Sequence, residues 1–155
     1  MIVDKVEKKV DNNHNIIILS DRKTSKKYAP IPILLVCSFV HHSLIKRKKR
    51  SKFGIVIESA EPREPHHFSM LFGYGASAIN PYMVNEIIEY HHKLGFLNEQ
   101  KLDKSIDNFN KAIAKGILKV MNKIGISTLH SYRGAQIFEA LGLRQKSVSY
   151  THLTL

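Results

Sequence analysis

The 155-residue chain contains one cysteine, no tryptophan and few acidic side chains. A single thiol, Cys37, cannot form a disulfide within the chain, nor supply the several thiolates of a zinc ribbon or an iron–sulfur cluster. The longest apolar stretch, Ile31–Val40, is far shorter than the roughly 20 residues that a membrane-spanning helix needs. The opening segment, Met1–Lys9, is charged and lacks the apolar part of a signal peptide. These absences indicate a cytoplasmic protein without a membrane partner.

Positive charge is in excess, because 24 Lys and Arg face 13 Asp and Glu and leave a formal net charge of +11. Such an excess either attracts nucleic acid or an anionic surface, or only keeps a lysine-rich surface soluble. Six of the cations lie within Lys46–Lys52, and no aromatic side chain is interleaved with them for base stacking. The pattern favours the second interpretation. It predicts that Lys46–Lys52 is a helix C-terminus with its following loop and that nucleic acid is not a partner.

Strand and helix patterns alternate along the chain. Short apolar or β-branched runs closed by turn residues predict strands at Asn15–Asp21, Phe53–Ser59 and Ala76–Asn80, with the first two buried on both faces. Helical spacing predicts helices in the segments between and after them: Ala29–Lys46, His66–Phe72, Pro81–Gly95, a segment capped by Asp103 or Ser105 and closed by Gly125, and Tyr132–Leu141. Such alternation predicts parallel strands with right-handed crossovers, and therefore an α/β sheet or part of a barrel.

Function in a parallel α/β fold gathers where the strands end, at the carboxyl edge of the sheet. The sequence places there a polar group that spans two successive strands and the segment between them: Glu58, Glu61, Arg63, His67 and Asn80. These five residues are expected at one rim, because neighbouring parallel strands end side by side. A carboxylate near an arginine can serve acid–base chemistry, whereas the alternative is Glu–Arg pairing that only stabilises the loop.

The remaining polar features predict no metal, nucleotide or nucleophile site. Histidines form three adjacent pairs, whose members point about 100° apart on a helix and lack a second histidine three or four residues away: His41-His42, His66-His67 and His91-His92. Gly73-Tyr74-Gly75 lacks the spacing of a phosphate-binding loop and predicts a tight turn. Cys37 lies within an apolar helix pattern and is expected to be an inert, buried thiol.

Four segments resemble the large (α) subunit of glutamate synthase: A-P-I-P-I-L-L-V-C-S-F-V-H-H (Ala29–His42), E-P-R-E-P-H-H-F (Glu61–Phe68), G-Y-G-A-S-A-I-N-P-Y (Gly73–Tyr82) and K-V-M-N-K-I-G-I-S-T-L-H-S-Y-R-G-A-Q-I-F-E-A-L-G-L (Lys119–Leu143). The resemblance covers about residues 1–143, more loosely over the first 28. It corresponds to the family's central region, running into the lead-up to the FMN-binding synthase barrel.

The resemblance implies a multidomain oxidoreductase that makes two glutamates from glutamine, 2-oxoglutarate and reductant. An amidotransferase domain releases ammonia with a cysteine at its mature N-terminus, and the ammonia passes through an internal tunnel to the FMN site. The iminoglutarate formed there is reduced to glutamate. A three-iron (3Fe-4S) cluster relays electrons from NADPH, through a small second subunit, or from ferredoxin.

Within that enzyme, the chain is expected to be a fragment. Residues 1–100 are expected to form part of the central α/β domain with an incomplete, truncated barrel-like sheet, and residues 101–146 a helical lead-in to the FMN domain. Residues 147–155 are expected to be a non-native tail. Because Ile2 follows Met1 and Cys37 is the single cysteine, the resemblance implies that the fragment has no catalytic residue and binds neither FMN nor a cluster.

The fragment's expected role is to couple the two catalytic domains. The rim of Glu58, Glu61, Arg63, His67 and Asn80 would then be a domain contact or a wall of the ammonia tunnel. The alternatives are a small basic nucleic-acid-binding protein and a free-standing α/β interaction module. An incomplete sheet with unpaired edges favours the fragment, because a free-standing module would close its core.

Overall fold

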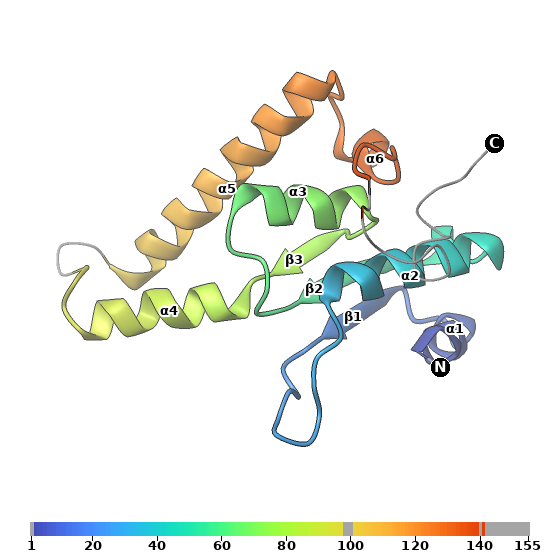
Figure 1. The fold of residues 1–155 in the computed structure, drawn as a ribbon, viewed down its shortest axis with the longest axis horizontal. Helices are drawn as coiled ribbons and strands as arrows, with labels where there is room; N and C mark the ends of the chain where they lie inside the picture. The colour runs from blue at the N-terminus through green and yellow to red at the C-terminus, as the bar shows by residue number, and fades with distance from the viewer. Residues whose placement is uncertain (1, 98–100, 140, 142–155) are drawn as a thin grey trace.

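The fold is an open α/β arrangement, which a computed structural model describes for residues 2–97, 101–139 and 141 (Figure 1). Its elements follow one another in this order: α1 (Ile2–Asp11), β1 (Ile16–Ser20), α2 (Ile33–Lys46), the short 3-10 turn η1 (Arg50–Lys52), β2 (Gly54–Glu58), α3 (Pro65–Gly73), β3 (Ala78–Asn80), α4 (Tyr82–Lys93), α5 (Leu102–Ile124) and α6 (Leu129–Tyr132). The expected non-native tail, residues 147–155, lies outside the described residues.

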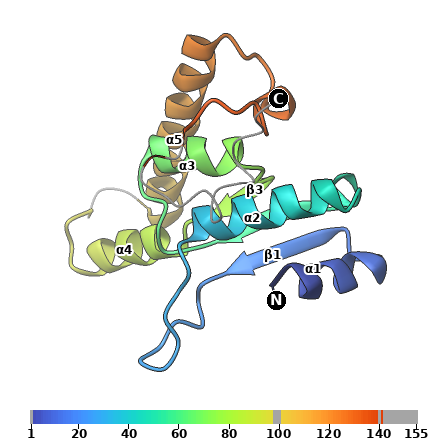
Figure 2. The same cartoon turned by 45° about the vertical axis from the view of Figure 1, so that its right-hand side comes forward.

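The three strands form one parallel sheet in the order β1-β2-β3, which confirms the predicted fold class. Ile17 and Leu19 of β1 and Ile55 and Ile57 of β2 point to one face and are buried. Residues of α1, α2 and α3 share the core cluster on that face, and Figure 2 shows α2 lying over β1. The β-branched runs therefore supply one half of the core and the apolar helices the other half.

The opposite face of the sheet is open over the residues that the structure describes. Ile16 and Ile18 are 65% and 62% exposed, so the prediction that β1 is buried on both faces is wrong. In β2 the residues of this face, such as Val56, are only half-buried. The reason is that α1, α2 and α3 pack on one side of the sheet, and a strand covered on one side alternates between buried and exposed residues. The expected incomplete, unclosed sheet is confirmed.

Helix α5 runs past α3 and α4 as a separate layer (Figure 1). It comes close to α3 at Gly116, where an added Cβ would lie 2.5 Å from the Pro65 ring. The predicted caps are wrong, because α5 begins after Lys101 without a side-chain hydrogen bond from Asp103 or Ser105. Its predicted end is confirmed, since Gly125 closes the helix in the left-handed conformation with a φ of 78°. No described helix is both long and apolar enough to cross a membrane.

The last helix differs from the expectation of a helix over Tyr132–Leu141. Helix α6 has four residues, and the Thr128 hydroxyl caps it by accepting a hydrogen bond of 3.2 Å from the Ser131 amide. Gly134 and Gln136 then take positive φ angles of 76° and 55°, which interrupt any helix. Helix α6 nevertheless fixes a core contact, because the Tyr132 side chain is fully buried.

Candidate functional site

The carboxyl ends of the strands form a polar edge, here called the carboxyl rim: Ser20–Arg22, Glu58–Glu61 and Asn80. Backbone hydrogen bonds extend the sheet into this rim. The Asp21 amide donates to the Glu58 carbonyl at 3.2 Å, and the Ser59 amide donates to the Asn80 carbonyl at 3.1 Å. Glu58 and Asn80 are direct partners in the β2–β3 register, so the structure brings these two expected residues together.

Asp21 organises the start of the loop that follows β2. Its carboxylate accepts the Ser59 hydroxyl at 2.6 Å and the Ala60 amide at 3.1 Å. Ser59 is fully buried, and its Oγ also accepts the Glu61 amide at 3.1 Å. Charge-assisted hydrogen bonds of this kind are the stronger class in proteins. Asp21 therefore links the end of β1 to the chain leaving β2.

Replacing Asp21 with alanine is expected to lower the free energy of unfolding by about 1–2 kcal/mol, because the buried Ser59 hydroxyl and the Ala60 amide lose their acceptor. Urea denaturation at pH 7 measures the change. Asp107→Ala is the matched control, since Asp107 pairs with Lys111 on the surface of α5 and its loss is expected to change stability by about 0.5 kcal/mol or less. Equal effects of the two substitutions would contradict the role given to Asp21.

Glu58 is held by groups from β1 and the turn after it. The Ser20 hydroxyl donates to its carboxylate at 2.6 Å and the Arg22 Nε at 2.9 Å. Arg22 also donates to Glu86 at 3.2 Å and lies 4.0 Å from the centre of the Tyr82 ring. The hydrogen bond from Ser20, followed by that from Arg22, lowers the pKa of Glu58. Glu58 therefore stays ionised as an anchor and does not suit the role of a general acid.

Glu61, at the end of the carboxyl rim, binds the start of α2. Its two carboxylate oxygens accept the Ile33 amide at 3.1 and 3.2 Å. Ile33 is the first residue of α2, where backbone amides lack partners within the helix and a negative charge is favourable. Pro32 before it has no amide hydrogen to offer. Glu61 therefore acts as the anionic cap of α2, a contact between the segments Glu61–Phe68 and Ala29–His42.

Arg63 and His67 lie in the loop and first turn that lead into α3. The Arg63 amide donates to His67 Nδ1 at 3.2 Å, and His67 Nε2 lies 3.4 Å from a Glu64 carboxylate oxygen. Across the part of the chain that the structure describes, Arg63 forms no ion pair with Glu58 or Glu61. Arg22 makes the Glu–Arg pair at this edge instead. The expected site thus omitted Ser20, Asp21 and Arg22, although the same rule for strand ends applies to them.

Cations of the basic run Lys46–Lys52 form ion pairs with other parts of the chain. Arg47 pairs with Asp4 and Glu7 of α1, and Lys49 pairs with Glu7 at 2.9 Å and with Asp11 at 2.8 Å. The run follows the predicted course, because α2 ends at Lys46 and η1 begins at Arg50. These contacts fasten α1 to the end of α2. The absence of a nucleic-acid partner stays a prediction.

A second polar cluster lies where β2 and β3 begin. Arg50 donates from Nε to His41 Nδ1 at 2.9 Å, and from its two terminal nitrogens to the Phe53 and Gly75 carbonyls at 2.7 Å each. Arg133 donates to the Ser77 hydroxyl at 3.0 Å. Arg50 and Arg133 thus donate to backbone carbonyls and to neutral side chains. Their hydrogen bonds join α2, the starts of β2 and β3, and the segment after α6.

The described residues do not fit an iron–sulfur cluster. Cys37 is fully buried, its thiol donates to the Tyr74 carbonyl at 3.5 Å, and burial raises its pKa to about 12. Such a thiol stays protonated, whereas a cluster needs several thiolates. No group of three histidine, cysteine or carboxylate side chains with metal-binding geometry occurs among the residues described.

Comparison with known proteins places the chain in a family. The family model for the glutamate synthase central domain matches residues 1–144. The chain is 44% identical over 139 residues to the NADPH glutamate synthase large chain of Bacillus subtilis, covering 90% of this chain and 9% of that protein. It is 41% identical over 152 residues to the NADH glutamate synthase of Saccharomyces cerevisiae, covering 91% and 7%.

A ferredoxin-dependent glutamate synthase of the genus Antithamnion is 39% identical over 158 residues, which cover 95% of this chain and 10% of that protein. The chain thus spans a tenth or less of the length of these relatives. With its parallel α/β sheet and a family match over nearly its whole length, the chain belongs to the glutamate synthase central domain family.

Proposed function

We propose that the chain is the central-domain part of a glutamate synthase, the oxidoreductase that forms two glutamates from glutamine, 2-oxoglutarate and reductant. Its role is to couple the amidotransferase and FMN synthase domains. The observation that carries the proposal is the family match over residues 1–144, combined with a carboxyl rim whose acids anchor the fold. Residues 1–100 are assigned to the central domain and residues 101–146 to the lead-in to the FMN domain.

Comparison of the relatives favours a role for this segment in a step that comes before electrons are supplied. Their names give NADPH, NADH and ferredoxin as reductants, yet the shared segment is 39–44% identical to this chain in all three. A segment that received electrons would have to match these different donors. In the proposed parent enzyme, FMN and the 3Fe-4S cluster are bound elsewhere. Its reductant comes from the small NADPH-oxidising subunit or from ferredoxin, and its location is the cytoplasm.

The carboxyl rim supplies the proposed contact. Glu58 and Glu61 are committed to Arg22 and to the start of α2, so they shape the rim from within. The side chains of Arg63 and Asn80 are exposed, and His67 Nδ1 accepts a hydrogen bond from the Arg63 amide. We assign Glu58, Glu61, Arg63, His67 and Asn80 to a domain contact or a wall of the ammonia tunnel. An exposed arginine without a carboxylate partner in the described chain suits such a contact.

Arg63→Ala tests the coupling role. For this test, this chain is grafted into the Bacillus subtilis large chain in place of the matching segment. Glutamine hydrolysis and glutamate formation are then measured in the same reaction. Loss of Arg63 is expected to raise the ratio of ammonia released to glutamate formed by roughly fivefold or more, the usual size of coupling between two sites. Lys115→Ala, an exposed cation on α5, is the control. An unchanged ratio with only a lower melting temperature would support loop stabilisation instead.

A further inference from the structure

Strand β1 has a free hydrogen-bonding edge in the described structure. The Asn15 carbonyl accepts the Gly54 amide at 2.8 Å, and the Asp21 amide donates to the Glu58 carbonyl at 3.2 Å. Alternate residues of a strand direct their backbone groups to the same neighbour, so the odd-numbered residues of β1 bond to β2. Ile16, Ile18 and Ser20 direct their amides and carbonyls to the other side. No described strand lies there, because β1 is the first strand of the sheet.

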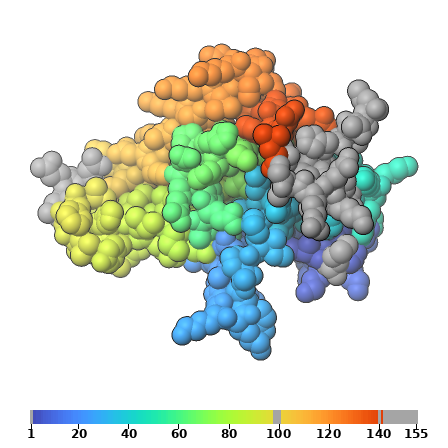
Figure 3. Space-filling view, in the orientation of Figure 1, coloured from blue at the N-terminus to red at the C-terminus, as the bar shows by residue number. Residues whose placement is uncertain are grey.

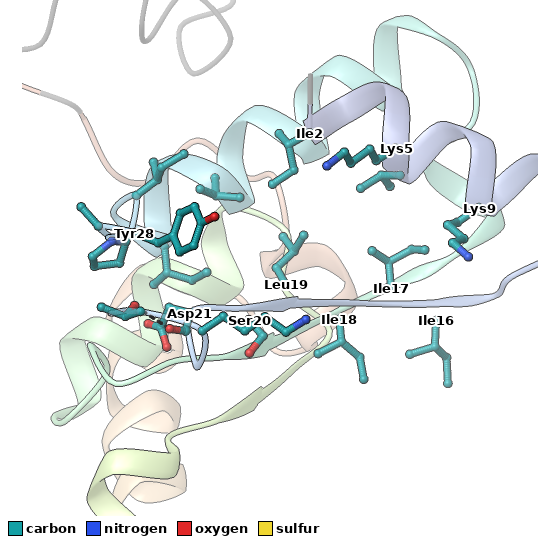
Figure 4. A pocket seen from close by; sticks show the side chains of 18 of the residues that line it. Ile2, Lys5, Lys9, Ile16, Ile17, Ile18, Leu19, Ser20, Asp21 and Tyr28 are labelled. Carbon is teal, nitrogen blue, oxygen red and sulfur yellow. Dashed lines mark hydrogen bonds between the residues drawn. The ribbon is translucent and has the colours of Figure 1, made fainter. Parts of the chain in front are cut away.

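An apolar pocket of about 600 Å³ lies along this edge, between β1, α1 and the segment before α2 (Figure 4). Apolar side chains from all three elements line it: Ile2, Val6, Ile17, Leu19, Tyr28 and Ile31. In Figure 4, Ile17 and Leu19 point towards the helices, whereas Ile16 and Ile18 point to the opposite side. Figure 3 shows the segment that leads into α2 projecting from the body of the molecule. Apolar surface is thus exposed above and below the free edge.

The charge around the pocket is positive on the side of α1. Lys5 and Lys9 of α1 and Lys23 after β1 line it, and no carboxylate of the described chain forms an ion pair with any of them. Helix α1 turns its acidic residues the other way, because Glu7 and Asp11 pair with the basic run after α2. The edge therefore combines unpaired backbone groups, apolar surface and unpaired lysines, a combination that natural sheets cover.

We propose that this edge binds an extended, acidic segment of the glutamate synthase chain, drawn from the part of that enzyme beyond the 155 residues. The segment adds to β1 as a further strand, a common mode of peptide recognition. Apolar side chains on one face of the added strand enter the pocket, those on its other face cover Ile16 and Ile18, and its carboxylates meet Lys5 and Lys9. About nine-tenths of the length of the relatives lies outside the match and can supply it. The inference rests on the proposed function.

Photo-crosslinking in the same Bacillus subtilis graft tests the partner. Ile18 is replaced by p-benzoyl-phenylalanine, and the matched control replaces Leu118 of α5, because the two side chains are 62% and 61% exposed. Position 18 is expected to cross-link to one acidic segment of the large chain outside the graft, whereas position 118 is not. Cross-links from position 18 to a second copy of the graft, or none, would overturn the proposal.

A charge at the edge gives a second measurement. Ile18→Lys is expected to lower the melting temperature of the grafted enzyme, because a lysine on an edge strand opposes the addition of a strand. The same change in the isolated chain is expected to have no effect, since Ile18 is exposed there. Leu118→Lys serves as the control in both proteins. If Arg63→Ala uncouples the enzyme while position 18 neither cross-links nor destabilises, this inference fails and the proposed function stands.

Discussion

Replacing Gly75 with alanine is expected to lower the free energy of unfolding by about 3–5 kcal/mol, the sum of backbone strain and overpacking. Gly75 has a φ of 108°, a conformation that residues with a Cβ rarely adopt. An added Cβ would lie 2.2 Å from His41 Nδ1. The imidazole cannot move aside freely, because it is buried and accepts the hydrogen bond from Arg50. Chemical denaturation of the purified variant measures the change.

Gly125→Ala is the matched control for this prediction. Gly125 also has a positive φ, of 78°, but an added Cβ would meet no atom within 4 Å. Its replacement is expected to cost only about 1–2 kcal/mol of backbone strain. The difference between the two variants isolates the collision with His41. Equal losses would show that His41 moves away and that the cluster around it is not rigid.

The stability of the chain is expected to fall by about 2 kcal/mol between pH 7 and pH 5 because of His41. Burial, followed by the charges of Arg50, His42 and Arg133, lowers the pKa of His41 from 6.5 to about 3. The hydrogen bond from Arg50 also requires an unprotonated Nδ1. In this pH range the unfolded chain takes up a proton that the folded chain does not. Acid therefore favours unfolding from about pH 6.5 downwards.

His41→Asn tests this origin of the pH dependence. An asparagine Oδ1 can accept from Arg50 but does not titrate, so the variant is expected to lose most of the difference in stability between pH 7 and pH 5. Some dependence remains, because burial also lowers the pKa of His42. Urea denaturation at pH 5, 6 and 7 measures the slope, with the exposed His91→Asn as the control. An unchanged slope in His41→Asn would contradict the assignment.

The cluster around His41 also shows how distant parts of the sequence depend on one another. His41, Gly75 and Arg133 belong to three of the four segments that resemble glutamate synthase. His41 and Gly75 are joined through Arg50, and Arg133 reaches Ser77 beside them. The fourth segment joins them at the start of α2, through Glu61 and Ile33. Segments that are separate in the sequence therefore form one packed unit.

The sequence by itself determined the alternation of strands and helices from β1 to α5, the parallel sheet and the family, but it did not predict α1. These properties depend on local residue preferences or on motifs that add up along the chain. The run Ile16–Ile18 is extended because β-branched side chains fit a pleated strand, and Gly125 ends α5 because it tolerates a positive φ. The family followed from motifs that are read directly along the chain. None of these inferences required knowing which surfaces meet.

Only the tertiary structure decided which faces are covered and which charges pair. Ile17 and Ile18 are both isoleucines in the same strand. Ile17 is buried under α1 and α2, whereas Ile18 lies on the open face. Glu58 pairs with Arg22, 36 positions away, and not with the nearby Arg63. Long-range pairing depends on where the strands end in space, because an ion pair forms only between groups brought within a few ångströms. Sequence proximity carries no such information.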